Sequence, residues 1–274
     1  MEIGATLDHL HLSSPDPERA ARFYADTYAM PARRIGDEWL CAAAGRRVAV
    51  SEGPAHRLKY AAFAFPDGAS RDAYAERIDA SVRMAQPASA LLDRDGVAVR
   101  DPDGNAIVFT VRASDAPAAK GLPPAQSQHF ALRTPDAARM LRFYHETLGL
   151  TISDRVLDEE GVLRACFLRT DALHHSLALF MAPESRFDHQ SFETTGWDAL
   201  REWADHMGEL RVPIVWGIGR HGPGNDTFFM VHDPDGNLAE ISSDIEVCAP
   251  ARPVGLWPHE QRTLNLWGGA IMRS

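Results

Sequence analysis

Three residues in the second half of the chain have types and positions that could bind a metal ion. His129 and His189 each open a predicted strand, and Glu240 lies on a later strand, on the side that also carries Leu238 and Ser242. Two imidazoles and one carboxylate form a facial triad that holds iron(II) and leaves coordination positions open. Zinc and manganese could bind the same set. The sequence therefore predicts a mononuclear metal site.

These three positions belong to an internal repeat. Asp8–Asp16 is echoed by Gln128–Asp136 at an offset of 120 residues, and Asp101–Asn105 is echoed by Asp233–Asn237. The second offset is 132 residues because the second copy carries insertions, and motifs repeated in the same order indicate duplicated structural units. Because the echoes span most of the chain, we predict two domains of common ancestry.

The two copies differ at the metal positions. His9, Tyr60 and Val108 stand in the first copy where His129, His189 and Glu240 stand in the second. Nine of the 12 histidines also follow residue 125. One ligand of three cannot hold a metal ion, so the first copy is expected to bind none and to contribute packing.

Each copy must provide strands that position these residues. Hydrophobic alternation, helical spacing and the Asp-Pro-Asp-Gly turns predict four successive βαβββ units, with helices over residues 70–81 and 197–208 among them. Ser14 and Thr134 are predicted N-caps of the first helix in each copy. The predicted fold class is α+β, with a pair of βαβββ units in each domain.

Composition sets the domain boundaries. Residues 113–125 are rich in small residues and proline and are predicted to be a linker between a domain at 1–112 and a domain at 126–245. The tail, residues 246–274, is apolar enough to pack on the body of the protein or on a neighbouring subunit, and we expect a homo-oligomer.

Charge and cysteine usage exclude several classes of protein. The net charge of −10 repels phosphate backbones and anionic lipid, so neither nucleic acid nor a membrane is an expected partner. No targeting segment or membrane span is visible in the sequence. The 3 cysteines have no CxxC spacing, which indicates a reducing, cytoplasmic location.

The motifs around the candidate ligands resemble the vicinal oxygen chelate superfamily, and within it the type I extradiol ring-cleavage dioxygenases. His129 precedes a helix that ends in the Phe-Tyr-x-x-x-Leu-Gly motif at residues 143–149, His189 ends Arg-Phe-Asp-His, and Glu240 ends Asp-Pro-Asp-Gly-Asn-Leu-Ala-Glu. The resemblance implies that each domain forms an open barrel. It also implies that these three residues bind Fe(II), or alternatively Mn(II).

Two further motifs are more specific to the dioxygenases. His174-His175-Ser-Leu-Ala resembles a motif whose second histidine is an acid-base catalyst, and Gly219-Arg-His221 resembles a segment whose histidine contacts the substrate. The resemblance therefore implies catalytic roles for His175 and His221, while we interpret His174 as structural or supporting. Met230 departs from the family, which usually has a tyrosine there that hydrogen-bonds the ionised substrate hydroxyl.

The resemblance implies cleavage of a catechol-type ring by O2 beside its two hydroxyl groups. Two alternatives stay open at this stage. One is a metal-dependent lyase or isomerase of the same superfamily, which oxygen uptake would separate from a dioxygenase. The other is a metal-free protein that binds an aromatic ligand, which metal content would distinguish.

Overall fold

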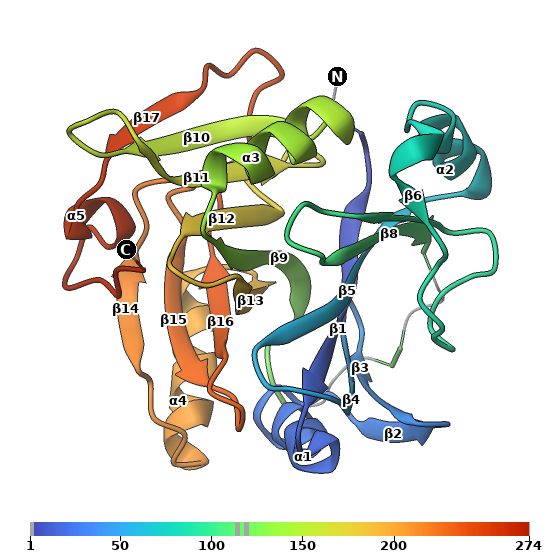
Figure 1. Ribbon diagram of the computed structural model, residues 1–274. Coiled ribbons are helices and arrows are strands. Elements are labelled where there is room, and N and C mark those ends of the chain that lie inside the picture. Colours follow the sequence, from blue (N-terminus) through green and yellow to red (C-terminus); the bar gives the residue numbers. More distant parts are fainter. Residues whose placement is uncertain (1–2, 113–115, 118–120, 274) are drawn as a thin grey trace.

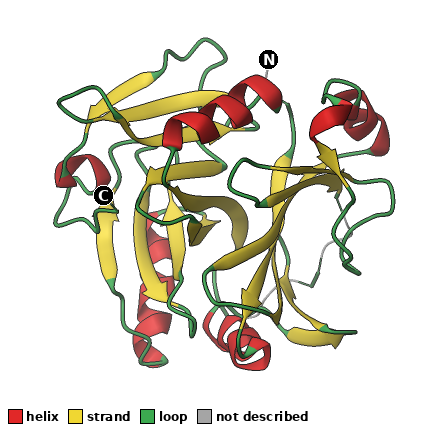
Figure 2. Ribbon diagram, viewed as in Figure 1, coloured by secondary structure: helices red, strands yellow, loops and turns green. Residues whose placement is uncertain are grey.

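Two β-sheets follow one another along the chain in the computed structural model, which describes residues 3–112, 116–117 and 121–273 (Figure 1). The strand order is β2-β3-β4-β1-β5-β8-β7-β6 in the first sheet and β14-β15-β16-β13-β9-β12-β11-β10-β17 in the second. The predicted linker, 113–125, falls partly on residues 113–115 and 118–120, outside the described residues. The helices lie on the outside of the strands (Figure 2).

The first sheet and its helices comprise β1 (Thr6–Ser14), α1 (Pro17–Thr27), β2 (Ala32–Ile35), β3 (Glu38–Ala43), β4 (Arg46–Glu52), β5 (Arg57–Phe65), α2 (Gly68–Ala75), the 3-10 turn η1 (Ala80–Val82), β6 (Arg83–Met84), β7 (Val97–Arg100) and β8 (Ala106–Val111). The second comprises β9 (Ala125–Thr134), α3 (Ala137–Arg142), the π-helical turn η2 (Phe143–Thr147), β10 (Thr151–Leu157), β11 (Leu163–Arg169), β12 (Leu177–Met181), β13 (Arg186–Thr194), α4 (Trp197–Glu209), β14 (Trp216–Arg220), β15 (Thr227–His232) and β16 (Leu238–Ser243). The tail adds β17 (Gly255–Pro258) and α5 (Gln261–Leu264).

This order of elements is four βαβββ units, so the predicted α+β fold is confirmed. The register of the two sheets confirms the internal repeat as well. On β13, Ser191 is paired with His129 of β9 and with Glu240 of β16. The corresponding trio in the first sheet is Ala62, His9 and Val108. The sequence alignment of the two copies therefore holds at the level of individual strand pairs.

Two local predictions were wrong at helix starts. The N-caps are Asp16 and Asp136, whose carboxylates accept from the backbone N–H of the third residue of each helix at 3.0 and 2.9 Å. Ser14 and Thr134 lie two residues earlier, and each hydroxyl accepts from the backbone N–H of that aspartate at 3.1 Å. An aspartate caps better here because it can reach the free N–H groups of the first turn with a full negative charge.

Helix lengths were predicted with mixed success. The helix expected over 197–208 is present as α4. The helix expected over 70–81 is shorter, since α2 ends at Ala75 and only the turn η1 follows. Ile78 lies in the intervening turn and packs in the core, where it is 3% exposed. Its apolar side chain continued the helical spacing in the sequence, although the helix itself had ended.

The two halves contact each other through a reciprocal pair of buried hydrogen bonds. Tyr24 of α1 donates its hydroxyl to Asp233 in the turn between β15 and β16 at 3.1 Å. Tyr144 of η2 donates to Asp101 in the equivalent turn of the first half at 2.8 Å. The repeated Phe-Tyr and Asp-Pro-Asp-Gly motifs therefore join the two halves.

The tail, 246–274, was predicted to pack on the body of the protein or on a neighbouring subunit, and its described residues pack on the body. β17 pairs in parallel with β10, and Leu266 donates its backbone N–H to the Arg220 carbonyl at 2.7 Å, which places α5 beside β14 (Figure 1). Within the described residues, no helix combines the length and apolarity needed to span a membrane.

Candidate metal centre

Three adjacent strands bring the predicted ligands together. His129 on β9, His189 on β13 and Glu240 on β16 are all buried, and their ligand atoms lie within 4.8 Å of one another. The two Nε2 atoms are 3.1 Å apart, and Glu240 Oε2 is 4.0 Å from His189 Nε2. Both histidines were expected to open their strands, but β9 begins at Ala125 and β13 at Arg186, because antiparallel pairing of these strands continues past the site.

The outer nitrogens of both histidines face hydrogen-bond acceptors. His189 Nδ1 is 2.6 Å from Asp188 Oδ1, and His129 Nδ1 contacts Gln128 Oε1. Gln128 donates its amide to the His175 carbonyl at 2.5 Å, which directs its oxygen to His129. With the proton of each ring on Nδ1, both Nε2 atoms carry lone pairs that face each other. Such a pair is repulsive unless a cation lies between the nitrogens.

Glu240 completes the set of acceptors. Its Oε1 accepts from Ser191 Oγ at 3.0 Å, whereas Oε2 is buried with no hydrogen-bond partner among the described residues. Burial raises the pKa of a carboxyl, but the interaction with His221 and the two ligand histidines outweighs burial and lowers the pKa of Glu240. A buried anionic oxygen beside two imidazole lone pairs fits a divalent cation.

The protonation of the first histidine also suits a ligand. Burial lowers the pKa of His129 to about 3. The negative charge of Glu240 raises this pKa, but by less than burial lowers it. The imidazole is therefore neutral near pH 7, which is the form that binds metals.

The two predicted catalytic histidines flank this set. The His175 ring centroid is 4.3 Å from that of His129, and burial holds the pKa of His175 well below its usual range. His221 lies 4.0 Å from Glu240 Oε2 through its Nε2 and is near the Leu264 carbonyl, 2.5 Å from Nδ1. Burial lowers the pKa of His221, but the nearby carboxylates of Glu240 and Asp226 raise it overall.

An apolar slot opens beside the ligands. The lining is mostly aromatic and aliphatic, with one arginine from the tail, and comprises His129, Phe167, His175, Ala178, Phe180, His189, Trp216, His221, Pro223, Met230, Leu264 and Arg273. Met230 is paired with Glu240 across β15 and β16, so the thioether lies where the resemblance led us to expect a phenol. The slot suits a flat aromatic ring with few polar contacts.

His174, interpreted as structural or supporting, lies behind His175 in a buried chain of polar groups. Its Nε2 is 3.2 Å from Asp154 Oδ2, and its Nδ1 is 3.0 Å from His175 Nδ1. Asp154 is itself bound by Arg252 at 2.8 Å and by the Trp257 indole at 2.7 Å, both from the tail. These contacts therefore fix His175 through its Nδ1.

Four residues near the centre were missed by sequence reasoning. Gln128 and Asp188 precede the ligands directly, so their position next to a histidine was an available signal. Asp226 and Arg273 gave none, because their partners are remote in the sequence. Asp226 forms a second group of ligand-type residues with His221 and Glu240; neither of its oxygens has a hydrogen-bond partner in the described part of the chain, and burial raises its pKa.

The first half has lost the equivalent arrangement. His9 Nε2 is 3.0 Å from the Tyr60 hydroxyl, and Val108 occupies the carboxylate position. Both groups of metal-capable residues found among the described residues lie in the second half of the chain. A tyrosine hydroxyl and an apolar side chain have replaced the second and third ligands.

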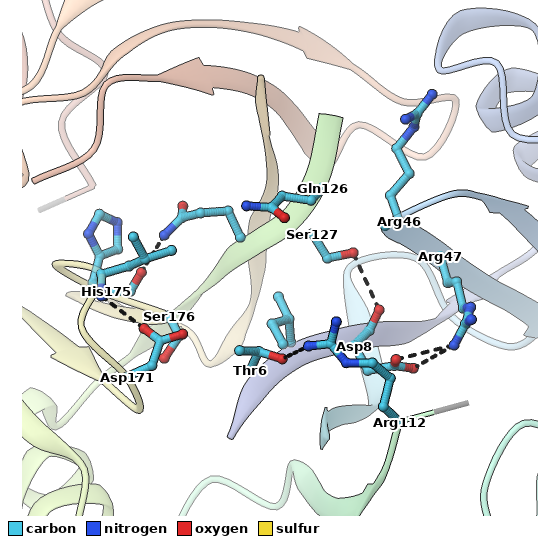
Figure 3. A pocket seen from close by; sticks show the side chains of 14 residues that line it. Thr6, Asp8, Arg46, Arg47, Arg112, Gln126, Ser127, Asp171, His175 and Ser176 are labelled. Carbon is cyan, nitrogen blue, oxygen red and sulfur yellow. Dashed lines mark hydrogen bonds and ion pairs between the residues drawn. The ribbon is translucent and has the colours of Figure 1, made fainter. Parts of the chain in front are cut away.

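A separate hollow lies between the two sheets (Figure 3). His175 and Gln126 reach it from the second half, and Asp8 and Arg47 from the first. Arg47 donates to Asp8 at 3.2 Å, and Ser127 donates to the Asp8 carbonyl at 3.3 Å. The bond from Ser127 to Asp8 therefore joins the two halves beside this hollow.

A sequence model of a known protein family matches the second half of the chain. Residues 126–241 match the sequence model of the Glyoxalase/Bleomycin resistance protein/Dioxygenase superfamily. The resemblance inferred from the motifs is therefore confirmed.

The relatives are ring-cleavage dioxygenases. Metapyrocatechase 2 of Cupriavidus necator is 28% identical over 289 aligned positions, covering 96% of this chain and 88% of the relative. Biphenyl-2,3-diol 1,2-dioxygenase 3 of Rhodococcus globerulus is 29% identical over 42% of this chain and 62% of its own length. The crystal structure of homoprotocatechuate 2,3-dioxygenase from Arthrobacter globiformis is 23% identical and shares the fold with a TM-score of 0.80, covering 99% of this chain and 90% of that one.

Proposed function

We propose that the chain is an extradiol ring-cleavage dioxygenase that uses Fe(II) and O2 to open a catechol-type ring. The observation that carries the proposal is the convergence of the ligand atoms of His129, His189 and Glu240 beside an apolar, aromatic-lined slot. The similarity to metapyrocatechase 2 along nearly the whole chain supports the same activity.

The metal would be held by the two Nε2 atoms and by Glu240 Oε2. When bound, Fe(II) would supply a Lewis acid that holds both diol oxygens and passes electrons between the ring and O2. Manganese(II) is the alternative ion. The protein supplies two imidazole ligands and one carboxylate, so a divalent ion in this centre keeps a net positive charge for an anionic substrate.

The other residues would position the diol and move protons. The rings of Phe167, Phe180 and Trp216 would hold the flat substrate and exclude water. His221 would hydrogen-bond a diol oxygen through Nε2, because its Nδ1 donates to the Leu264 carbonyl. His175, neutral at pH 7, would accept a proton from the substrate and return it to the product.

We propose three further properties of the whole protein. The domains would be 1–112 and 126–245, supported by the end of β8 at Val111 and the start of β9 at Ala125. A cytoplasmic location is supported by 3 free, buried cysteines. A homo-oligomer is supported by exposed apolar side chains of the tail, namely Val247, Val254, Leu256 and Trp267.

The test is metal content together with oxygen uptake. The protein would be loaded with Fe(II) without oxygen and mixed with catechols at an oxygen electrode. We expect one iron per chain and uptake of O2 in the wild type, and loss of both in His129→Ala, His189→Ala and Glu240→Gln. His232→Ala, an exposed histidine of the same half, is the matched control and should retain both. Stoichiometric iron in the three ligand variants would refute the proposal, and iron without oxygen uptake would favour a lyase or isomerase.

A further inference from the structure

We infer that Arg273 of the tail is a positioning residue of the metal centre, which fixes the His189 ring through Asp188 and so slows loss of the metal. This inference rests on the proposed function, because it requires His189 to be a ligand. It concerns a residue 85 positions from its partner in sequence, on a segment outside the four βαβββ units.

Arg273 is held in a single buried geometry. Its Nη2 and Nε donate to the two oxygens of Asp188 at 2.8 and 3.2 Å, a bidentate pair. The guanidinium also lies 4.7 Å from the Phe180 ring centroid and 4.9 Å from that of Trp216. Only 7% of Arg273 is exposed. The guanidinium is therefore held both by the carboxylate and by two rings of the slot.

Asp188 passes this geometry to the ligand. Its Oδ1, which accepts from Arg273, is also 2.6 Å from His189 Nδ1, while Oδ2 accepts from Arg133 at 2.5 Å. Two arginines, Arg273 and Arg133, therefore donate to this carboxylate, which leaves it an acceptor toward His189. An ionised carboxylate can only accept, so the His189 proton stays on Nδ1 and Nε2 faces the other ligands.

The other ligand histidine has no such connection. The acceptor for His129 is the neutral amide of Gln128, which is fixed by the His175 backbone rather than by the tail. The two ligands therefore depend on different parts of the chain. A variant of Arg273 should weaken the hold on the metal through His189 alone and should leave the His129 contact in place.

The experiment measures how fast the loaded protein loses metal to excess chelator without oxygen, for Fe(II) and for Co(II), whose visible spectrum reports the ligand geometry. We expect Arg273→Gln and Asp188→Asn each to speed metal loss by about 10-fold to 100-fold. Both should also change the Co(II) spectrum in the same way. Arg273→Lys, which keeps the charge without the fork, should lie between these variants and the wild type. Arg262→Gln, an exposed arginine of the same segment, is the matched control.

The double variant Arg273→Gln with Asp188→Asn separates a relay from independent effects. We expect it to lose metal no faster than the more affected single variant, because both changes break one chain of contacts. Wild-type metal loss in Arg273→Gln, while His189→Ala fails to hold metal, would overturn the inference and leave the proposed function intact. Fast loss in Arg273→Gln with wild-type behaviour in Asp188→Asn would also overturn it, since the tail would then act without the carboxylate. Full metal retention in His189→Ala would defeat the proposed metal site itself.

Discussion

The histidines around the candidate metal centre differ in what holds their outer nitrogens. His129 faces a neutral amide, His189 a carboxylate, His175 another histidine and His221 a backbone carbonyl. An anionic acceptor raises the basicity of the ring it binds more than a neutral one does. The four imidazoles are therefore chemically distinct although all are buried or largely buried.

The neutral His175 lies beside the ligands without belonging to the group of converging ligand atoms. We expect His175→Ala to keep stoichiometric metal and to lose about 10²-fold to 10⁴-fold in turnover, because acid-base catalysis contributes on that order. Metal analysis and steady-state oxygen uptake of the same preparations check this. Unchanged turnover would show that another group moves the proton.

Met230 offers the converse test, because it lies across from Glu240 and lines the slot. Met230→Tyr introduces a hydroxyl donor beside the substrate oxygens. We expect unchanged metal content and, where ionisation of the diol limits the rate, higher turnover or a pH profile displaced to lower pH. The measurement is oxygen uptake against pH with matched metal loading. A lower metal content would mean that the phenol displaces Glu240 instead.

Glu193 on β13 makes stability depend on pH. Burial raises its pKa from 4.5 to about 7, and its Oε1 accepts from the Ile245 N–H at 3.1 Å. The folded state therefore binds a proton that the unfolded state releases, so the stability from this group falls as pH rises from about 4.5 to 7.

We accordingly expect Glu193→Gln, which keeps the hydrogen-bond acceptor, to become more stable than the wild type as the pH rises from about 4.5 to 7. The gain should reach roughly 2 kcal/mol above pH 7 and vanish below pH 4.5. Urea unfolding at pH 4.5, 6 and 8 measures it. A gain of equal size at all three pH values would assign the effect to packing instead of ionisation.

Among individual residues, the sequence predicted those that occupy equivalent positions in the two copies of the repeat. The ligand set emerged because His129, His189 and Glu240 occupy equivalent places in duplicated units, and the register of the sheets brings them together. Arg273 and Asp226 could not be found in this way, because their roles depend on contacts across long stretches of chain.

The metal ligands lie in the interior of their strands and not at the strand ends. His129 and His189 lie well inside β9 and β13, where both neighbours fix the strand, whereas the sequence suggested strand starts. Alternation of side chains reveals that a strand exists and which face a residue takes. It does not reveal where pairing stops, since that depends on the partner strand.

The same limit applies to the helices. The length of α4 was predicted because its apolar positions, such as Leu200, Trp203 and Met207, repeat without interruption. The caps were misassigned, because serine, threonine and aspartate within two residues all suit an N-cap by type. Only the backbone path decides which side chain reaches the free N–H groups.

The tail is the element least visible in the sequence and is fixed to β10 by Asp154. Arg252 contacts this fully buried carboxylate at 2.8 Å. Arg252→Gln removes a charge partner of a buried anion, which costs roughly 3 kcal/mol. We expect lower stability to urea and faster limited proteolysis within the tail. Arg262→Gln, on the exposed side of α5, serves as control and should match the wild type.

The whole molecule depends on the reciprocal contacts between its halves. Tyr24 and Tyr144 each bind an aspartate of the other half, Asp233 and Asp101 respectively. Each Tyr→Phe variant should lower the free energy of unfolding by about 1.5 to 3 kcal/mol, because each leaves a buried carboxylate short of a donor. Both should retain full metal content.

The double variant tests whether the halves unfold as one body. We expect the two losses to add, since the bonds share no residue, and the urea transition to remain single. The measurement is urea unfolding followed by both tryptophan fluorescence and circular dichroism. Two separated transitions would show that, without these two bonds, the two halves unfold independently of each other.

The symmetry of this exchange bears on how the protein arose. Each half gives a tyrosine and receives one, which is the pattern of an isologous interface between two identical subunits. A single-copy ancestor would have made both bonds between separate chains and would have depended on concentration to do so. Joining the copies in one polypeptide made that encounter intramolecular. Selection could then relax at one of two formerly equal centres, and His9, Tyr60 and Val108 are what remains there.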